Sequence, residues 1–168
     1  MATARGLQPP PARDDTAVRV WRFVREPFTA GTWRRVAYAL LAFPVGVACV
    51  PLSLLGAPTG RWQRGLLRRF LGARPAGSSG GLAHALLATP LNLLVLAVTA
   101  YGWSLVPMNL GWPLRAGSDY ADAWGGPTFA GAWTFHAVAG GLGFLLVMPW
   151  LGRAMASVQL RVASALLP

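Results

Sequence analysis

The chain has 168 residues, of which 54% are hydrophobic and only 12% are charged. An ordinary soluble domain carries about 25% charged residues, so this composition argues against one and favours a membrane protein. All 15 basic residues are arginine, and they exceed the five acids to give a formal net charge of +10. Because the arginines flank long apolar runs and no nucleic-acid-binding motif is present, we expect their partners to be anionic lipid headgroups and not nucleic acid.

The N-terminal region combines a proline-rich stretch with an arginine-rich one. Residues 1–17 include three consecutive prolines and lack apolar periodicity, which predicts a disordered tail. Arg19, Arg22 and Arg25 then recur every three residues opposite an apolar side. This spacing is typical of a short basic amphipathic helix on a membrane surface, although the solvated face of an ordinary helix has the same pattern. The first long apolar run begins later than in a usual signal peptide, so we expect no cleaved leader.

The segment 36–58 carries no charge and is about as long as one membrane crossing. Thr32 is a candidate N-cap for a helix that enters it. Pro44 and Pro51 interrupt the segment, and each proline removes a backbone donor and bends a helix. A second basic amphipathic segment follows at 61–74. Its candidate contacts with lipid headgroups are Arg61, Arg64, Arg68 and Arg69.

Two later runs predict full transmembrane helices, at residues 82–106 and 131–151. The polar loop between them, 107–130, holds two Asp and one Arg. Arg153 and Arg161 then mark a terminal amphipathic segment. The expected fold class is therefore all-α: an integral membrane helical bundle with basic amphipathic interfacial helices.

The distribution of arginine predicts how the chain is oriented. Excess Arg marks cytoplasmic flanks, so we expect the N-terminus, the segment 61–74 and the C-terminus in the cytoplasm and the 107–130 loop outside. The segment 36–58 then cannot cross once, and it is too short for two crossings of about 20 residues each. We predict a short re-entrant hairpin bent between Pro44 and Pro51. The alternative is three crossings with five arginines outside. In both arrangements the chain is a multi-pass protein of the plasma membrane.

Several short motifs resemble those of a known family. They are Glu26-Pro27-Phe28, Thr32-Trp33-Arg34 and 38–46 in the first half, and 124–128, 131–133, His136-Ala137 and Gly140-Gly141 in the second. Over residues 18–168 the chain resembles the sensor domain that precedes the kinase core of many histidine kinases in high-GC Gram-positive bacteria and also occurs alone. The resemblance implies a membrane-embedded, signal-receiving module of about four passes. Here the first hairpin is shortened and no kinase core follows, so we expect any signal to leave through a partner protein.

The candidate ligand-binding residues lie in and beside the outer loop. The loop combines carboxylates with aromatic surface at Asp119, Tyr120, Asp122 and Trp124. Such a set suits a cationic molecule or a partner protein, and a polar loop beside an interfacial aromatic belt has the same residues. His136 is an ionisable group inside a predicted span, which makes it a candidate pH- or ligand-sensitive residue. A histidine hydrogen-bonded between packed helices is the simpler interpretation.

Other residues suit helix packing. Asn92 and Thr99 lie seven residues apart on one helical face, where they could hydrogen-bond across helices. Ala132, Gly140 and Gly143 approximate a face of small residues on which another helix could pack closely.

No catalytic, cofactor or metal site is predicted. His84 and His136 would lie more than ~15 Å apart in depth, whereas one metal needs its ligands within about 2 Å. We expect a non-enzymatic, sensor-like signalling module that acts through a partner such as a kinase, a regulator or a transporter, and that could form a homo-oligomer. The alternative is a structural or accessory subunit of a membrane complex without its own ligand. A membrane enzyme or small transporter is disfavoured, because the apolar runs contain no Asp, Glu, Lys or Arg.

Overall fold

The computed structural model describes residues 15–75, 80–116 and 120–167. Over these residues the chain is all-α, which confirms the predicted fold class at this level. The elements in chain order are α1 (Asp15–Arg25), a 3-10 turn η1 (Glu26–Phe28), α2 (Ala30–Leu54), α3 (Thr59–Leu71), α4 (Gly81–Leu110), α5 (Pro113–Ala116), α6 (Phe129–Phe135), a π-helical segment η2 (His136–Leu142) and α7 (Gly143–Leu166).

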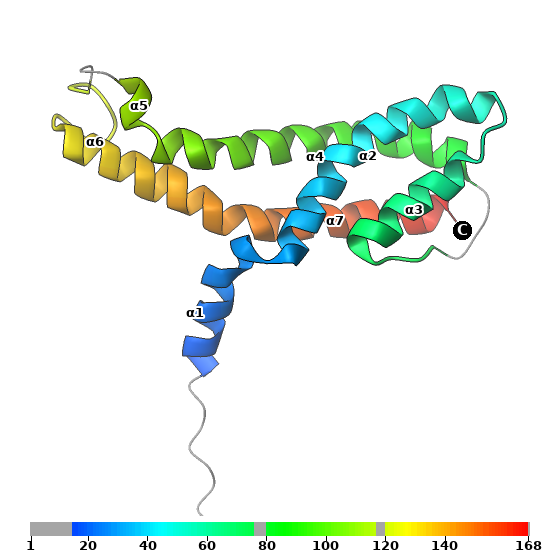
Figure 1. The fold of residues 1–168 in the computed structure, drawn as a ribbon, viewed down its shortest axis with the longest axis horizontal. Helices are drawn as coiled ribbons and strands as arrows, with labels where there is room; N and C mark the ends of the chain where they lie inside the picture. Colours follow the sequence, from blue (N-terminus) through cyan, green and yellow to red (C-terminus); the bar gives the residue numbers. More distant parts are fainter. Residues whose placement is uncertain (1–14, 76–79, 117–119, 168) are drawn as a thin grey trace, which may run out of the picture.

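Helix α1 carries the first arginine repeat. It begins at Asp15, so residues 15–17 of the predicted tail belong to its first turn, while residues 1–14 lie outside the described part of the chain. All side chains from Thr16 to Arg25 are exposed. The helix leaves the rest of the molecule near the middle of the long axis (Figure 1). An exposed helix with one basic and one apolar side is the form expected at a membrane surface.

Helix α2 begins earlier than expected. The Thr29 hydroxyl accepts a hydrogen bond from the backbone N–H of Thr32 at 3.3 Å, so Thr29, and not Thr32, is the N-cap. The same hydroxyl donates to the Glu26 carbonyl oxygen at 2.9 Å. The turn η1 and the start of α2 are therefore held together by side chain–backbone hydrogen bonds.

The predicted re-entrant hairpin within 36–58 is wrong. Helix α2 is one continuous helix, and both Pro44 and Pro51 lie inside it. A proline removes one backbone hydrogen bond and bends a helix, but its φ is compatible with the helix. Two prolines therefore bend this segment without reversing it.

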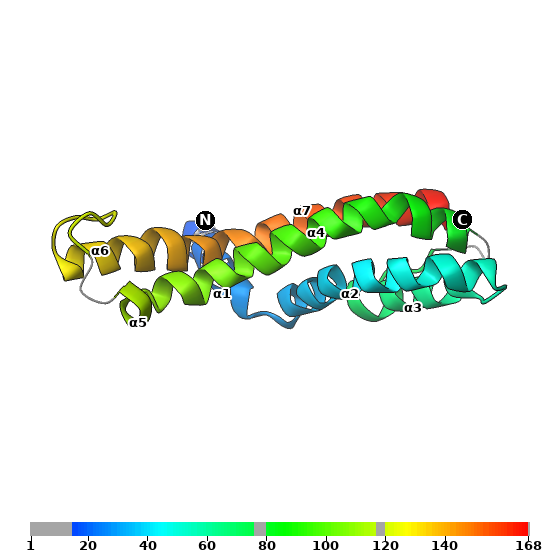
Figure 2. The same ribbon diagram turned by 90° about the horizontal axis from the view of Figure 1, so that it is seen from above.

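The chain reverses after α2. Gly56 has a φ of +81°, a conformation that favours glycine, in the turn that leads to α3. Helix α3 then runs back beside α2 (Figures 1 and 2). At the end of the α2–α3 pair that is opposite the connecting turn, Arg34 Nη2 donates a hydrogen bond to the Arg69 carbonyl oxygen at 2.7 Å. The chain thus does form a hairpin, but the hairpin consists of α2 and the basic helix α3, and not of two halves of the segment 36–58. It brings arginines of both helices close together.

The long axis is formed by α4 and by α6, η2 and α7, which run side by side (Figure 1). Within the described ranges, three helices are long and apolar enough to cross a membrane: Ala30–Leu54, Gly81–Leu110 and the continuous helical stretch Phe129–Leu166. The last two contain the predicted spans 82–106 and 131–151. Length and composition thus support a multi-pass membrane protein.

The two later apolar runs, 82–106 and 131–151, lie at different positions along the long axis of the molecule. Asn92, in the middle of the first run, contacts Gln159, which lies beyond the end of the second. Gly140, in the middle of the second run, lies against Asn109, which is beyond the end of the first. The midpoints are offset by roughly 15 residues, or about 22 Å at about 1.5 Å per residue. A bilayer core about 30 Å thick, crossed at a right angle, therefore holds only part of each run.

The hydrophobic core lies in the half of the molecule where α2, α3, α4 and α7 meet. Its buried residues are Tyr38, Ala42, Leu67, Ala163 and Leu167. In the other half, side chains on η2 such as Val138 and Leu142 are exposed. Such apolar surface suits contact with lipid.

Candidate functional site

The most distinctive polar feature of the described residues is a buried carboxylate between two arginines. The Glu26 side chain is only 6% exposed, and its Oε1 lies 2.5 Å from Arg153 Nη2 and 3.4 Å from Arg35 Nη1. The Thr32 hydroxyl lies 2.9 Å from the Glu26 carbonyl oxygen and 3.3 Å from Oε1. We call Glu26, Thr32, Arg35 and Arg153 the Glu26 clasp. It joins η1 and the adjacent α2 to α7, which is distant in the sequence.

Local sequence explains the position of Glu26. Pro27 follows it and fixes a backbone angle suited to the first turn of a helix, which here is the 3-10 turn η1. Residues 26 and 27 are both buried, so this turn anchors the chain between the exposed α1 and the packed α2. The clasp therefore sets where α1 leaves the molecule.

Aromatic contacts extend the clasp toward α1. The Arg153 guanidinium carbon lies 4.7 Å from the centre of the Trp150 ring, and Phe23 of α1 stacks on the same tryptophan at 5.7 Å. A guanidinium over an indole ring gains a cation–π interaction. Arg153 thus interacts with both a carboxylate and an aromatic ring, and the ring in turn contacts α1.

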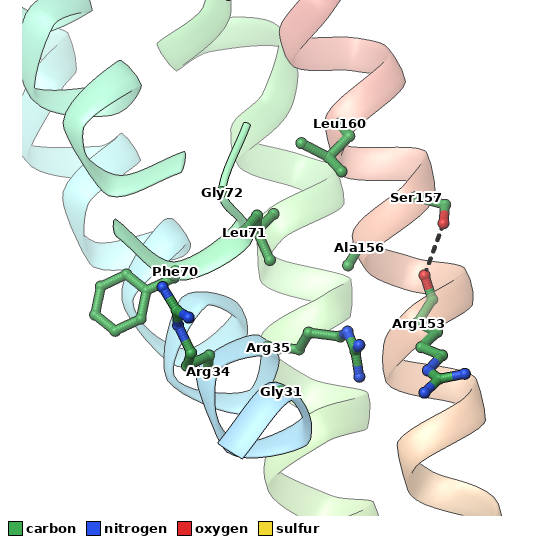
Figure 3. A pocket seen from close by; sticks show the side chains of 10 residues that line it. All are labelled: Gly31, Arg34, Arg35, Phe70, Leu71, Gly72, Arg153, Ala156, Ser157 and Leu160. Carbon is green, nitrogen blue, oxygen red and sulfur yellow. Dashed lines mark hydrogen bonds between the residues drawn. The ribbon is translucent and has the colours of Figure 1, made fainter. Parts of the chain in front are cut away.

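A cavity of about 430 Å³ lies beside the clasp, between the start of α2, the end of α3 and α7. In Figure 3 the three arginine side chains lie along one side of it, and Leu71 and Leu160 lie along another. The Arg153 Nε atom is buried and has no hydrogen-bond partner among the described residues. The complete lining is Gly31, Arg34, Arg35, Phe70, Leu71, Gly72, Arg153, Ala156, Ser157 and Leu160. We call this cavity the arginine pocket.

The described members of the predicted loop set do not line the arginine pocket. Asp119 lies outside the described residues. Asp122 and Trp124 are exposed, and Trp124 contacts Phe135 at 5.8 Å between ring centres. Tyr120 is half-buried with its ring edge against Phe129. The described members of this set thus lie around an aromatic cluster at the end of the molecule formed by α5 and α6 (Figure 1).

His136 belongs to the same aromatic cluster. Its Nδ1 donates to the Ala132 carbonyl oxygen at 2.8 Å, and its ring stacks on Trp112 at 4.9 Å. His84 lies near the opposite end of α4, where its Nδ1 is 2.6 Å from Gln63 Oε1 of α3. Among the described residues, no group of three or more His, Cys, Asp and Glu is placed to hold a metal ion.

The predicted packing residues occupy different environments. Asn92 is buried, and its Oδ1 accepts a hydrogen bond from Gln159 Nε2 at 2.8 Å. Thr99 is buried too, but its hydroxyl has no partner in the described part of the chain. Ala132 is fully buried.

The glycines of the predicted small-residue face also differ. A Cβ at Gly140 would overlap the Asn109 side chain of α4, so the two helices approach closely there. A Cβ at Gly143 would meet only the Val138 carbonyl oxygen, at 3.6 Å on its own helix. The second close approach to α4 occurs at Gly141, which lies against Leu110.

The predicted contacts with lipid headgroups differ in how exposed they are. Arg61, Arg68 and Arg69 are exposed on α3. Arg64 is only 7% exposed and lies against Gly60 within the bundle. Arg64 thus lies on the packed side of the helix, and its role as a headgroup contact stays a prediction.

Sequence reasoning missed the buried polar residues Glu26, Gln63 and Gln159. It also missed the half-exposed Arg153 as the counterpart of Glu26 in the clasp. Glu26 could have been noticed, because it is a single acid among arginines and is followed by proline at the start of a helical segment. The partners of the other three lie far away in the sequence, so only the fold identifies them.

No protein-family model matches the chain, and no curated protein or solved structure with significant similarity to it was found. The resemblance to the sensor domain of histidine kinases therefore remains a prediction.

Proposed function

We propose that this chain is a non-enzymatic, sensor-like membrane module that transmits changes in its helix packing to a partner protein. The observation that carries the proposal is the Glu26 clasp, in which one buried carboxylate contacts arginines of α2 and α7. Because the clasp also holds the turn after α1, a shift of α7 relative to α2 would change the position of α1. Helix α1 is exposed along its length and is available to a partner.

The energetics of the clasp suit a switch between two arrangements of the helices that it joins. A buried ion pair is strong only while its geometry is good, and separating its members leaves charges that are poorly hydrated. The side chains of Arg35 and Arg153 are 25% and 38% exposed, so each can exchange its carboxylate contact for water at moderate cost. Packed helices with two discrete arrangements are the usual means by which a local change reaches a distant surface.

The motifs of the family resemblance support the same assignment. Glu26 and Thr32 belong to the two motifs at its start, and both are members of the clasp. His136 and Gly140 belong to the motifs of the second half and lie where η2 contacts Trp112 and Asn109, at the end of α4. Under this proposal a kinase, a regulator or a transporter receives the signal, and anionic lipids surround the basic helices.

The proposed topology places the N-terminus, α3 and the C-terminus in the cytoplasm of the cell, with the loop after α4 outside the plasma membrane. In this topology α2 does not cross the membrane, because α3 turns back beside it on the cytoplasmic side (Figures 1 and 2). Support comes from the arrangement of charge: α3 and the end of α7 lie in the half of the molecule opposite α5 and α6 (Figure 1). Excess arginine marks cytoplasmic segments.

The alternative is an accessory subunit that stabilises a membrane complex without a ligand. The close approach of α4 and η2 at Gly140 favours this role, because a tightly packed pair is a rigid scaffold. This alternative needs no movement at the clasp.

Affinity purification of the tagged full chain from native membranes in mild detergent tests the two functions. We expect a kinase or regulator to co-purify with the wild-type chain and its yield to fall several-fold with Glu26→Gln. An Arg74→Gln variant removes one charge from an exposed site that belongs neither to the clasp nor to the candidate loop, and it serves as the control. Co-purification of a transporter whose yield is insensitive to Glu26→Gln would favour the accessory subunit, and isolation of the chain without any partner would contradict both.

A further inference from the structure

We propose that the arginine pocket binds the phosphate group of an anionic membrane lipid. This inference rests on the membrane location within the proposed function and does not require a partner protein. It assigns a defined site to one lipid headgroup, distinct from the diffuse attraction of exposed arginines to the membrane surface.

The charge balance of the pocket favours an anion. Arg34, Arg35 and Arg153 line it, and Glu26 is the carboxylate paired with two of them. Two positive charges are therefore in excess at the cavity. Guanidinium groups bind phosphate through paired, charge-assisted hydrogen bonds.

The start of α2 adds to this field. Gly31, in the first turn of the 25-residue helix, lines the pocket. The first turn of a helix carries partial positive charge because its backbone N–H groups lack partners within the helix. Both the side chains and the helix end therefore favour a negative group at the same place.

The apolar side of the pocket favours an amphiphile over a free phosphate ion. Phe70, Leu71 and Leu160 line the cavity together with the arginines (Figure 3). A free ion gains nothing from such a wall, whereas the glycerol and upper acyl carbons of a lipid bury apolar area there. The volume of about 430 Å³ falls in the range of roughly 300–1,000 Å³ that is usual for ligand pockets.

The position of the pocket along the bundle suits a headgroup. Trp33 follows Gly31 by two residues and contacts Trp103 at 4.9 Å, and Trp150 lies under Arg153. Tryptophan gathers at the boundary between hydrocarbon and water, which is also the level of lipid phosphates.

The test is native mass spectrometry of the purified, delipidated full chain in detergent. The probes are phosphatidylglycerol, phosphatidylcholine with the same acyl chains, and inorganic phosphate. We expect one phosphatidylglycerol per chain, and roughly tenfold weaker binding with Arg34→Gln, since a charge-assisted hydrogen bond is lost. Arg161→Gln removes the same charge from an exposed site on α7 that is outside the pocket lining, and it is the matched control.

A second pair of variants tests the cavity without changing charge. Ser157 is exposed and lines the pocket, so Ser157→Trp should block binding, whereas Ser164→Trp on the same helix should not. Equal losses for Arg34→Gln and Arg161→Gln, unchanged binding with Ser157→Trp, or preferential binding of inorganic phosphate would each overturn the proposal. Partner capture is measured separately, so a failure of lipid binding is distinguishable from a failure of the proposed function.

Discussion

Glu26 lies buried between Arg35 and Arg153, although a carboxylate taken out of water is costly unless it is paired. The same rule explains why Asn92 meets Gln159 and why Gln63 meets His84, since each buried polar group finds a partner on another helix. Hydrogen bonds of this kind contribute about 0.6 kcal/mol each in membrane proteins, so they specify helix positions more than they stabilise them.

Replacement of Glu26 by glutamine tests this account at a single residue. Glutamine keeps the size of the side chain but removes its charge, which leaves two guanidinium groups close together without a carboxylate. We expect a loss of about 1–3 kcal/mol, less than for a fully buried pair because both arginines are partly exposed. Thermal unfolding in detergent, followed by tryptophan fluorescence, measures the effect. Asp122→Asn should leave the unfolding temperature unchanged, and an equal shift for both variants would contradict the role of the clasp.

At the scale of elements, the helices tolerate features that usually end them. Pro44 and Pro51 lie within α2, and the π-helical η2 lies between α6 and α7 without breaking the helical course of the chain. Single π-helical turns within helices often occur at functional positions. Here the π-helical turns contain Gly140 and Gly141, which lie against Asn109 and Leu110 of α4.

The contrast between Gly140 and Gly143 gives a matched test of this helix contact. We expect Gly140→Ala to destabilise the chain by about 1–3 kcal/mol, because its methyl group would overlap Asn109. Gly143→Ala meets only an ordinary contact on its own helix, and alanine favours helix, so it should be neutral or slightly stabilising. Unfolding temperatures in one detergent decide between these outcomes, and equal effects would show that the close approach is absent.

At the scale of the whole molecule, the arrangement of the basic elements is the main organising feature. Helix α3 packs beside α2, and the end of α7 lies in the same half, while α5 and α6 form the other end (Figures 1 and 2). The two later apolar runs, 82–106 and 131–151, are offset along the long axis and do not mark one common membrane-spanning layer. The proposed orientation in the membrane therefore rests on the arrangement of the basic elements.

Cysteine labelling in intact cells tests this orientation. Buried Cys49 is first replaced by alanine. Gly65→Cys is suitable on α3, because a Cβ there meets nothing within 4 Å, and Leu114→Cys is suitable on α5, because that side chain is 93% exposed. We expect an impermeant maleimide to label position 114 but not position 65. Both positions should react after the membrane is permeabilised. Labelling at position 65 in intact cells would support three crossings with α3 outside.

The sequence by itself determined the fold class, the approximate places of the apolar helices and the alternation of basic and apolar segments. These properties follow from composition and from periodicity along one helix, which are local. The candidate site was only partly accessible in this way. Asn92 could be recognised as an interhelical polar residue, but its partner Gln159 could not, because the two are far apart in the sequence.

Only the tertiary structure decided where the chain reverses and which polar groups meet. Two prolines in an apolar run predict a bend, but whether the bend becomes a turn depends on the helix that packs against it, which here is α3. In the same way, Arg153 resembles a topology signal in the sequence and becomes half of an ion pair only because α7 passes η1. Pairing energies depend on distance in space, and that distance is set by the packing of all the helices together.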